Sequence, residues 1–260
     1  MAGRSLAAWS ASGEKPEILY WVGCAASFDD RAQRVARAFV RLLEAAQVKW
    51  GFLGTEEMCT GDPAKRAGND FLFQMLALQN IQTLQQYEVS EIVATCPHCF
   101  NILKNEYPEL GGHFRVWHHT QYLYRLLAEG RLKLPQDGKL EGTIVFHDPC
   151  YLGRGNQEYE SPRAILRRAG ALLKEPERHK DFALCCGAGG AQMFKEPEPG
   201  HKDINIERTE ELLRLSPSRI AVGCPFCMTM ITDGVKHAGK QQEVRVQDVA
   251  EILAERLGLL

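Results

Sequence analysis

The sequence lacks a long hydrophobic run and a surplus of positive charge, and we expect no signal peptide in it. Its longest apolar stretches, such as Thr143–Phe146, fall far short of the ~20 residues that span a bilayer, so we expect no transmembrane segment. A formal net charge of −2 argues against nucleic acid as a partner. Residues 1–15 are too short and too polar for a signal peptide, and the first dozen are predicted to be a flexible lead-in.

A disulfide framework and a nicotinamide site are missing too. Nine cysteines are an odd number and cannot all pair in disulfide bonds, and a chain of 260 residues does not need such bonds for stability. We therefore expect a reducing, cytoplasmic compartment in which the thiols are free for metal or redox chemistry. The glycine-rich turn at Gly187 lacks the following helix and acidic residue of a dinucleotide-binding fingerprint.

What the sequence does contain is an internal repeat of cysteines. The interval from Cys24 to Cys59 is 35 positions, and the interval from Cys150 to Cys185 is again 35. A Cys-Pro-X-Cys motif follows in both halves, 37 positions later in the first and 39 in the second. Every cysteine falls on a repeat position: Cys24, Cys59, Cys96 and Cys99, then Cys150, Cys185, Cys186, Cys224 and Cys227.

The predicted strands and helices repeat with the cysteines. In the first half we predict strands at 17–22, 48–53, 90–95 and 114–117, each followed by a helix, the longest at 63–86. In the second half we predict strands at 143–146, 180–184, 219–222 and 243–246. This alternation predicts the α/β class, with two pseudo-symmetric repeat domains and mainly parallel sheets. The domains are predicted at 14–132 and 141–260, with a linker across Gly130–Gly142.

The five thiols of the second half exceed the four ligands of a tetrahedral zinc ion. Adjacent Cys185 and Cys186 would also not easily bind the same ion, whereas different irons of a cluster can accept different thiolates. Glycine at Gly187 lets backbone N–H groups approach cluster sulfur atoms. His147 and Asp148 are candidates for hydrogen bonding or proton handling beside the cluster. Cys186 and His147 are the candidate catalytic residues.

The first half departs from this pattern at Thr60, which stands where the second half has Cys186. Its four thiols suit either a structural zinc ion or an ordinary cubane cluster, and both possibilities stay open. The Thr60 hydroxyl is a candidate weak ligand or a donor to a cluster sulfide. His98, between the two cysteines of its motif, is predicted to be exposed, and the alternative is that it serves as a substitute ligand.

At these residues the chain resembles a known family. The pattern Cys150, Cys185-Cys186-Gly187 and Cys224-Pro225-Phe226-Cys227 resembles the CCG domain of heterodisulfide reductase and its relatives. The segment Met58–Leu76 is most similar to the branch that passes electrons from electron-transfer flavoprotein to menaquinone. The resemblance covers residues 17–258. It implies that these five cysteines and Gly187 bind a 4Fe–4S cluster of the non-cubane type, with a second 4Fe–4S cluster or zinc in the first half.

The resemblance also implies a function. We expect an iron–sulfur subunit of a multi-subunit oxidoreductase that carries electrons between a flavoprotein and a quinone or disulfide. The implied partners are a flavoprotein, a ferredoxin-like electron donor and a membrane quinone-reducing subunit, which would hold the chain at the cytoplasmic face. Relatives often carry a ferredoxin-like domain and a membrane segment, so we expect a stand-alone subunit or the C-terminal part of a larger chain.

Two other functions stay open. The chain is alternatively a catalytic subunit that reduces a disulfide directly at the cluster. It is otherwise a zinc-binding scaffold that docks partners through the helix predicted at 30–46 or the apolar stretch Phe71–Leu78. The first of these surfaces is a basic stripe, formed by Arg31, Arg34, Arg37 and Arg41. The second belongs to a helix whose composition favours a buried, central position over a docking face.

Overall fold

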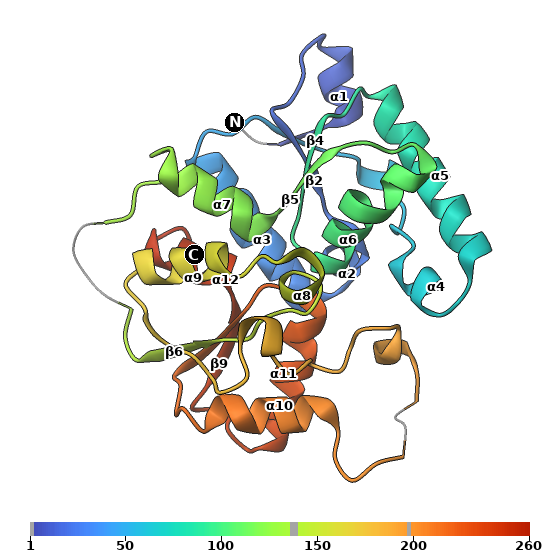
Figure 1. Ribbon diagram of the computed structural model, residues 1–260. Helices are drawn as coiled ribbons and strands as arrows, with labels where there is room; N and C mark the ends of the chain where they lie inside the picture. The colour runs from blue at the N-terminus through green and yellow to red at the C-terminus, as the bar shows by residue number, and fades with distance from the viewer. Residues whose placement is uncertain (1–2, 136–139, 197–198) are drawn as a thin grey trace. The chain divides into compact units, whose positions relative to one another are not determined.

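The computed structural model describes residues 3–135, 140–196 and 199–260. The chain divides into two compact units, Met1–Leu132 and Lys133–Leu260 (Figure 1). The linker predicted across Gly130–Gly142 includes this division, and its residues 136–139 lie outside the described residues.

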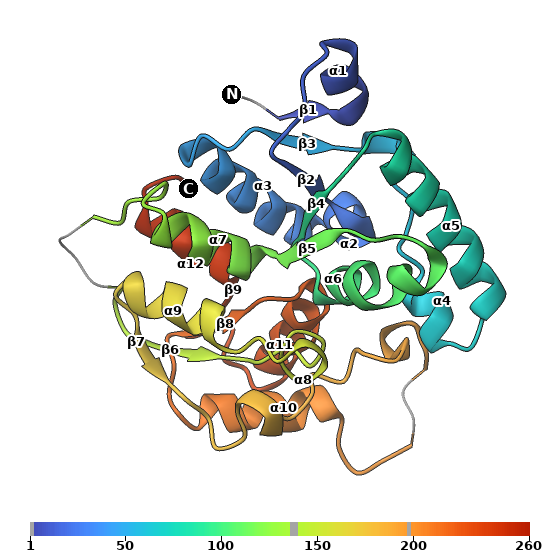
Figure 2. The same cartoon turned by 45° about the horizontal axis from the view of Figure 1, so that its top comes forward.

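The first unit is built on a five-stranded parallel sheet. Its strand order is β1-β3-β2-β4-β5, and every neighbouring pair is parallel (Figure 2). The strands are β1 Arg4–Ser5, β2 Ile18–Trp21, β3 Trp50–Phe52, β4 Glu91–Ala94 and β5 Arg115–His118. Strand β2 is buried along its whole length, as expected of a central strand covered on both faces.

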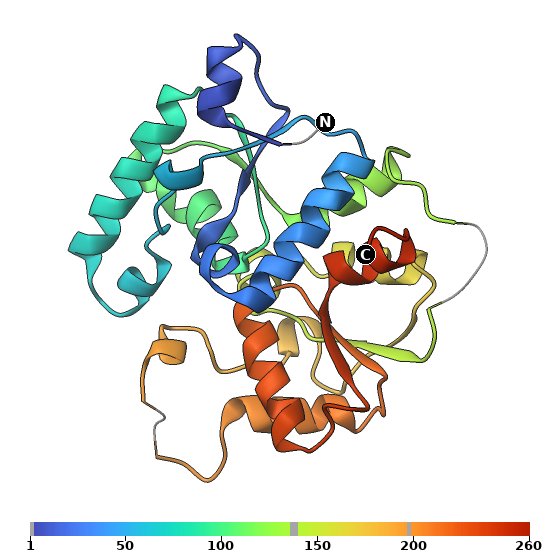
Figure 3. The ribbon, with the colours of Figure 1, turned by 180° about the vertical axis from the view of Figure 1, so that it is seen from behind.

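Helices cover both faces of this sheet. The longest on one face is α3, which crosses in front of the strands in the view from behind (Figure 3), whereas α6 lies over the opposite face (Figure 1). The buried residues of α3, among them Val35, Phe39 and Leu42, recur at helical spacing and face the sheet. The helices are α1 Leu6–Ala11, α2 Gly23–Phe28, α3 Asp30–Ala45, α4 Asp62–Arg66, α5 Asp70–Gln86, α6 Pro97–Asn101 and α7 His119–Ala128.

The second unit repeats the plan with four parallel strands in the order β7-β6-β8-β9. The strands are β6 Thr143–Phe146, β7 Leu172–Lys174, β8 Arg219–Val222 and β9 Arg245–Asp248. The helices are α8 Gly153–Asn156, α9 Glu160–Arg168, α10 Ile204–Leu213, α11 Pro225–His237 and α12 Val249–Arg256. Helix α10 packs against α11, and α9 packs against α12. The predicted α/β class with two repeats of parallel sheet is confirmed.

The N-terminal segment is not a flexible lead-in, and that prediction is wrong. Strand β1 pairs with β3, and α1 buries Leu6 and Trp9. The indole Nε1 of Trp9 donates to the carbonyl oxygen of Trp50 at 3.2 Å. Two buried residues in so short a helix give no readable period, which is why the composition alone suggested a loose segment.

The single helix predicted at 63–86 is two helices, α4 and α5. Gly68 has a positive φ of 84°, and the Asn69 side chain accepts from Leu72 N at 3.1 Å, so one helix ends and the next begins here. Helix α5 is not central either. Much of its apolar surface is exposed, at Phe71, Leu72, Met75 and Leu78.

The strand predicted at 180–184 is also wrong, because the edge strand of the second sheet is β7. Residues Lys180–Phe182 form a tight 3₁₀ turn. Their backbone binds side chains instead of a strand: Lys180 N donates to Asp148 Oδ2 at 2.8 Å, and Ala183 O accepts from Arg154. Within the described residues, no helix has both the length and the hydropathy needed to cross a membrane.

The N-terminal packing gives a first prediction. We expect Trp9→Ala to lower the free energy of unfolding by about 3–5 kcal/mol, because a buried indole and its hydrogen bond are lost. Ser10→Ala, at an exposed position of the same helix, is the control. Urea unfolding measures both, and equal stability of the two variants would show that the segment does not pack on the sheet.

Candidate metal centre

The cysteines lie where each parallel sheet reverses its strand order. In the first unit β2 and β4 are neighbours, with β3 beyond β2 and β5 beyond β4. Cys24, on α2, follows β2, and Cys96 caps α6 after β4. In the second unit β6 and β8 precede Cys150 and Cys224 in the same way. Connections at the carboxyl ends of such a strand pair diverge and leave room for a ligand.

The four thiols of the first unit form two hydrogen-bonded pairs. The hydrogen bond with Cys59, followed by burial, raises the pKa of Cys24, and the same bond lowers the pKa of Cys59 to about 6. A hydrogen bond with Cys96, together with burial, raises the pKa of Cys99. Cys96 and Cys99 are buried, whereas Cys24 is exposed. Each pair is thus joined by a hydrogen bond between thiols, which places two sulfur donors side by side.

The five thiols of the second unit form one connected group. The Sγ atoms of Cys186 and Cys227 are 3.3 Å apart. Hydrogen bonds with Cys150 and Cys186 lower the pKa of Cys185, and the bond to Cys185 raises the pKa of Cys150. Hydrogen bonds with Cys186 and Cys224, together with burial, raise the pKa of Cys227. The structure therefore brings together all five second-half cysteines singled out in the sequence.

Both units hold one sulfur atom with a backbone N–H two residues later. Gly61 N donates to Cys59 Sγ at 3.5 Å, and Gly187 N donates to Cys185 Sγ at 3.3 Å. The two glycines have almost the same positive φ, 91° and 89°. A side chain is strained at this φ, and a Cβ at Gly61 would lie 2.8 Å from the Phe73 ring. The turn therefore needs glycine in both copies.

Thr60 occupies the place of the second adjacent thiol. It is buried, and its Oγ1 lies 3.9 Å from Cys99 Sγ, at the repeat position where Cys186 lies 3.3 Å from Cys227. The hydroxyl faces the other sulfur atoms without adding a fifth thiolate. The two sites thus have the same frame and different numbers of sulfur donors.

His147 is wholly buried beside the second group of thiols. One imidazole nitrogen lies within 4.8 Å of the Sγ atoms of Cys186 and Cys227. Its Nδ1 accepts from Arg208 Nε at 3.0 Å, while Nε2 has no protein partner among the described residues. Burial, followed by the charge of Arg208, lowers the pKa of His147 to about 3. The imidazole is therefore neutral.

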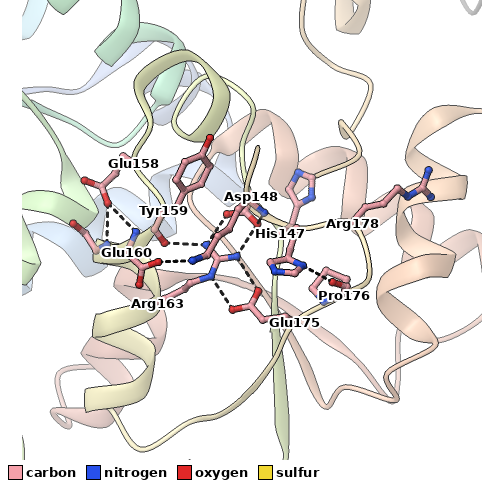
Figure 4. Close-up of polar contacts among 12 residues, drawn as sticks. His147, Asp148, Glu158, Tyr159, Glu160, Arg163, Glu175, Pro176 and Arg178 are labelled. Carbon is pink, nitrogen blue, oxygen red and sulfur yellow. Dashed lines mark hydrogen bonds and ion pairs between the residues drawn. The ribbon is translucent and has the colours of Figure 1, made fainter. Parts of the chain in front are cut away.

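Asp148 anchors the turn that carries Cys150 (Figure 4). Its two carboxylate oxygens accept from Arg163 Nη1 and Nη2 at 2.7 and 2.8 Å, and Arg163 also binds Glu175. Burial raises the pKa of Asp148, but the hydrogen bonds and charge of Arg163 outweigh it and hold the pKa below its usual value. Asp148 is thus an ionised anchor and does not handle protons.

The first unit anchors its cysteines differently. His98 is buried, so its predicted exposure is wrong, and its Nδ1 lies 2.9 Å from Asp62 Oδ2. Glu57 accepts from the N–H groups of Val22 and Gly23 at 3.0 and 2.5 Å. Burial raises the pKa of Glu57 to about 7. Sequence reasoning missed Glu57, Arg163 and Arg208, because nothing in the local pattern distinguishes them from surface charges.

A cavity of about 540 Å³ reaches the first group of thiols. Cys24 and Cys59 line it, together with Glu57, Phe28 and Met58. The first site therefore opens to its surroundings.

The donor sets fit an iron–sulfur cluster. Both contain sulfur atoms linked by hydrogen bonds, with backbone N–H groups directed at sulfur, which is how proteins bind and tune such clusters. Four donors in the first unit also fit zinc. Five donors in the second exceed what a single tetrahedral ion accepts.

A family model described as CCG, a cysteine-rich domain, matches residues 18–104 and again residues 144–232. These segments are the two halves of the repeat and make up more than half of the chain. Among solved structures, a hypothetical protein from Helicobacter pylori has a TM-score of 0.59 and 10% identity, over 99% of this chain and 50% of that one. At this identity the likeness shows the fold alone.

Curated relatives carry redox names. The chain is 47% identical to "EtfAB:quinone oxidoreductase" of Syntrophomonas wolfei, over 93% of this chain and 34% of that protein. It is 45% identical to "Probable iron-sulfur-binding oxidoreductase FadF" of Bacillus subtilis, over 94% of this chain and 34% of that protein. It is 32% identical to one of the heterodisulfide reductase subunits of Methanosarcina barkeri, over 95% of this chain and 60% of that protein. The chain thus spans about a third of the first two relatives. Their names and the two CCG domains support iron–sulfur binding.

The Asp148–Arg163 pair gives a prediction on pH. Because the pKa of Asp148 is depressed by folding, its stabilisation is present above the unfolded pKa of about 3.9 and is lost as the pH falls below it. We expect Asp148→Asn to cost about 3–5 kcal/mol at neutral pH, since Arg163 loses a buried partner, and to flatten the acid limb of the stability curve.

Asp233→Asn is the matched control, because Asp233 forms an exposed pair with Lys236. It should cost less than about 1 kcal/mol. Urea unfolding of the metal-free, reduced protein at several acidic pH values measures all three proteins. Coincident curves for the wild type and Asp148→Asn would contradict the assignment.

Proposed function

This chain belongs to the family of cysteine-rich CCG domains, and on that premise we propose that it is the iron–sulfur, electron-transferring part of an oxidoreductase. The observation that carries the proposal is the convergence of five thiols in the second unit, with Cys186 and Cys227 only 3.3 Å apart. So many sulfur donors in one group suit a cation, and more than one metal ion is needed to use them all. An iron–sulfur cluster supplies one-electron redox chemistry at such a site.

The five ligands would be Cys150, Cys185, Cys186, Cys224 and Cys227. Adjacent Cys185 and Cys186 favour a cluster of the non-cubane 4Fe–4S type, in which different irons take the two neighbours. Gly187 N–H, which already donates to Cys185 Sγ, would partly neutralise that thiolate. Burial of Cys186, Cys224 and Cys227 excludes water from most of the site.

The first unit would hold a second cluster or a zinc ion on Cys24, Cys59, Cys96 and Cys99. Cys24 is exposed, and the cavity at Cys59 and Glu57 opens beside it. This is the more accessible site.

The partners follow from the relatives' names. A flavoprotein as electron donor and a quinone as acceptor are proposed because the name EtfAB:quinone oxidoreductase includes both. The relatives are longer than this chain, so a ferredoxin-like donor and a membrane quinone-reducing part are proposed to lie on their additional segments or on separate subunits. The chain would then work at the cytoplasmic face of a membrane through those partners.

A second candidate function is direct reduction of a disulfide at the second unit. The 32% identity to the Methanosarcina heterodisulfide reductase protein, over 95% of this chain, favours it. Turnover of a disulfide with a reduced viologen dye, abolished by Cys186→Ser, would establish this function. Binding of zinc alone at both sites would instead favour the docking scaffold.

We predict that protein purified without air is brown and contains both iron and acid-labile sulfide. Cys186→Ser should lose the iron, the sulfide and the electron paramagnetic resonance signal of the second site, because it removes a ligand from the buried group. The matched control is Cys24→Ser, which should keep that signal because Cys24 belongs to the other unit. A colourless, iron-free wild type would end the proposal.

Thr60→Cys tests why the two sites differ. The added thiol faces Cys99, so we expect the first site to bind more iron and sulfide and its spectrum to approach that of the second. Thr83→Cys, on α5 of the same unit, is the control for an added thiol. Unchanged metal content and spectrum in Thr60→Cys would show that this position is not the missing ligand.

A further inference from the structure

Each unit keeps a buried N–H group with no partner at the same repeat position. His147 lies three residues before Cys150, and Trp21 lies three residues before Cys24. His147 Nε2 and Trp21 Nε1 are both without a hydrogen-bond partner among the described residues, although each residue is almost fully buried. A buried N–H left unpaired costs about 1–3 kcal/mol, so its occurrence in both copies calls for a reason.

Both residues lie near the thiols. An imidazole nitrogen of His147 is within 4.8 Å of the sulfur atoms of Cys186 and Cys227. In the first unit a Cβ placed on Gly23 would lie 3.4 Å from Cys99 Sγ and 4.0 Å from Trp21 Cδ1, the ring atom bonded to Nε1. Histidine and tryptophan share little else than a planar ring with an N–H. The repeat position therefore has a ring with a buried, unpaired nitrogen near the thiols in both units.

Arg208 decides which nitrogen of His147 carries the proton. Its Nε donates to His147 Nδ1, so Nδ1 must be the lone-pair nitrogen and the neutral ring carries its proton on Nε2. Arg208 is fixed in turn, because its Nη1 donates to the carbonyl of Arg178 at 2.8 Å and to Glu211 Oε2 at 2.9 Å. A ring locked in this tautomer cannot ligate a metal through Nε2 and can only donate from it.

We propose that His147, held in its Nε2–H tautomer by Arg208, donates a hydrogen bond to sulfur of the cluster site in the second unit and raises its reduction potential. Arg208 is a positioning residue in this scheme. The inference rests on the proposed iron–sulfur function. Its physical basis is that an N–H directed at sulfur stabilises the more negative, reduced state, so the potential rises with the donor and falls without it.

The test compares three variants of the complete, anaerobically purified protein. His147→Leu removes the donor, His147→Gln restores both an acceptor for Arg208 and an N–H donor, and His179→Leu is the control at a half-buried histidine bound to Pro176 O. A redox titration should show a more negative potential for His147→Leu, by up to the equivalent of a tenfold change in the one-electron equilibrium, about 59 mV. His147→Gln should recover most of it, and His179→Leu should match the wild type.

A second readout does not need a variant that folds. With ¹⁵N-labelled histidine in the wild type, electron–nuclear double resonance should show a histidine nitrogen and an exchangeable proton coupled weakly to the cluster spin. A strong coupling typical of a directly bound nitrogen, or no coupling, would overturn the inference. An unchanged reduction potential in His147→Leu that retains full iron and sulfide would also overturn the inference. A wild type without iron and sulfide would refute the proposed function itself and this inference with it.

Discussion

The structure depends on holding several sulfur atoms in contact. Thiolates repel one another, and the chain resists that repulsion with the rigid carboxyl ends of parallel strands and with donors aimed at sulfur. The hydrogen bonds between Cys150 and Cys185, and between Cys24 and Cys59, show how closely these groups are crowded. The same crowding is what makes the sites strong ligands. The sheets, the glycine turns and the buried anchors all serve this one arrangement.

The two units solve the same problem with different chemistry. Asp148 and Arg163 fix the turn before Cys150 through a buried ion pair, whereas Glu57 takes that role in the first unit by accepting two backbone N–H groups. The glycine turn that follows Cys59 in one unit and Cys185 in the other is retained almost unchanged. Thr60 then removes one sulfur donor from a frame that still has room for it. The two units therefore differ in their ligands and anchors, whereas the glycine turn keeps the same backbone conformation.

Cysteine spacing predicted the repeat, the fold class and the grouping of the thiols, because motifs at the ends of parallel strands must meet at one edge of a sheet. Predictions from local patterns were wrong where contacts between distant residues determine the structure. Residues 180–184 looked like a strand, but Asp148 and Arg154 bind this stretch. His98 looked exposed because its partner Asp62 lies 36 positions earlier. Arg208 gave no signal at all, since its role depends on a histidine 61 positions away.

The thiols differ in exposure, and this difference determines which site is oxidised first in air. Cys24 is exposed beside an open cavity, while no thiol of the second unit is more than partly exposed. Molecular oxygen and peroxides attack accessible thiolates first. Damage should therefore begin in the first unit and leave the second intact for longer. Samples exposed briefly would then be mixtures in which one half of the repeat has decayed, so the order of decay itself distinguishes the two sites.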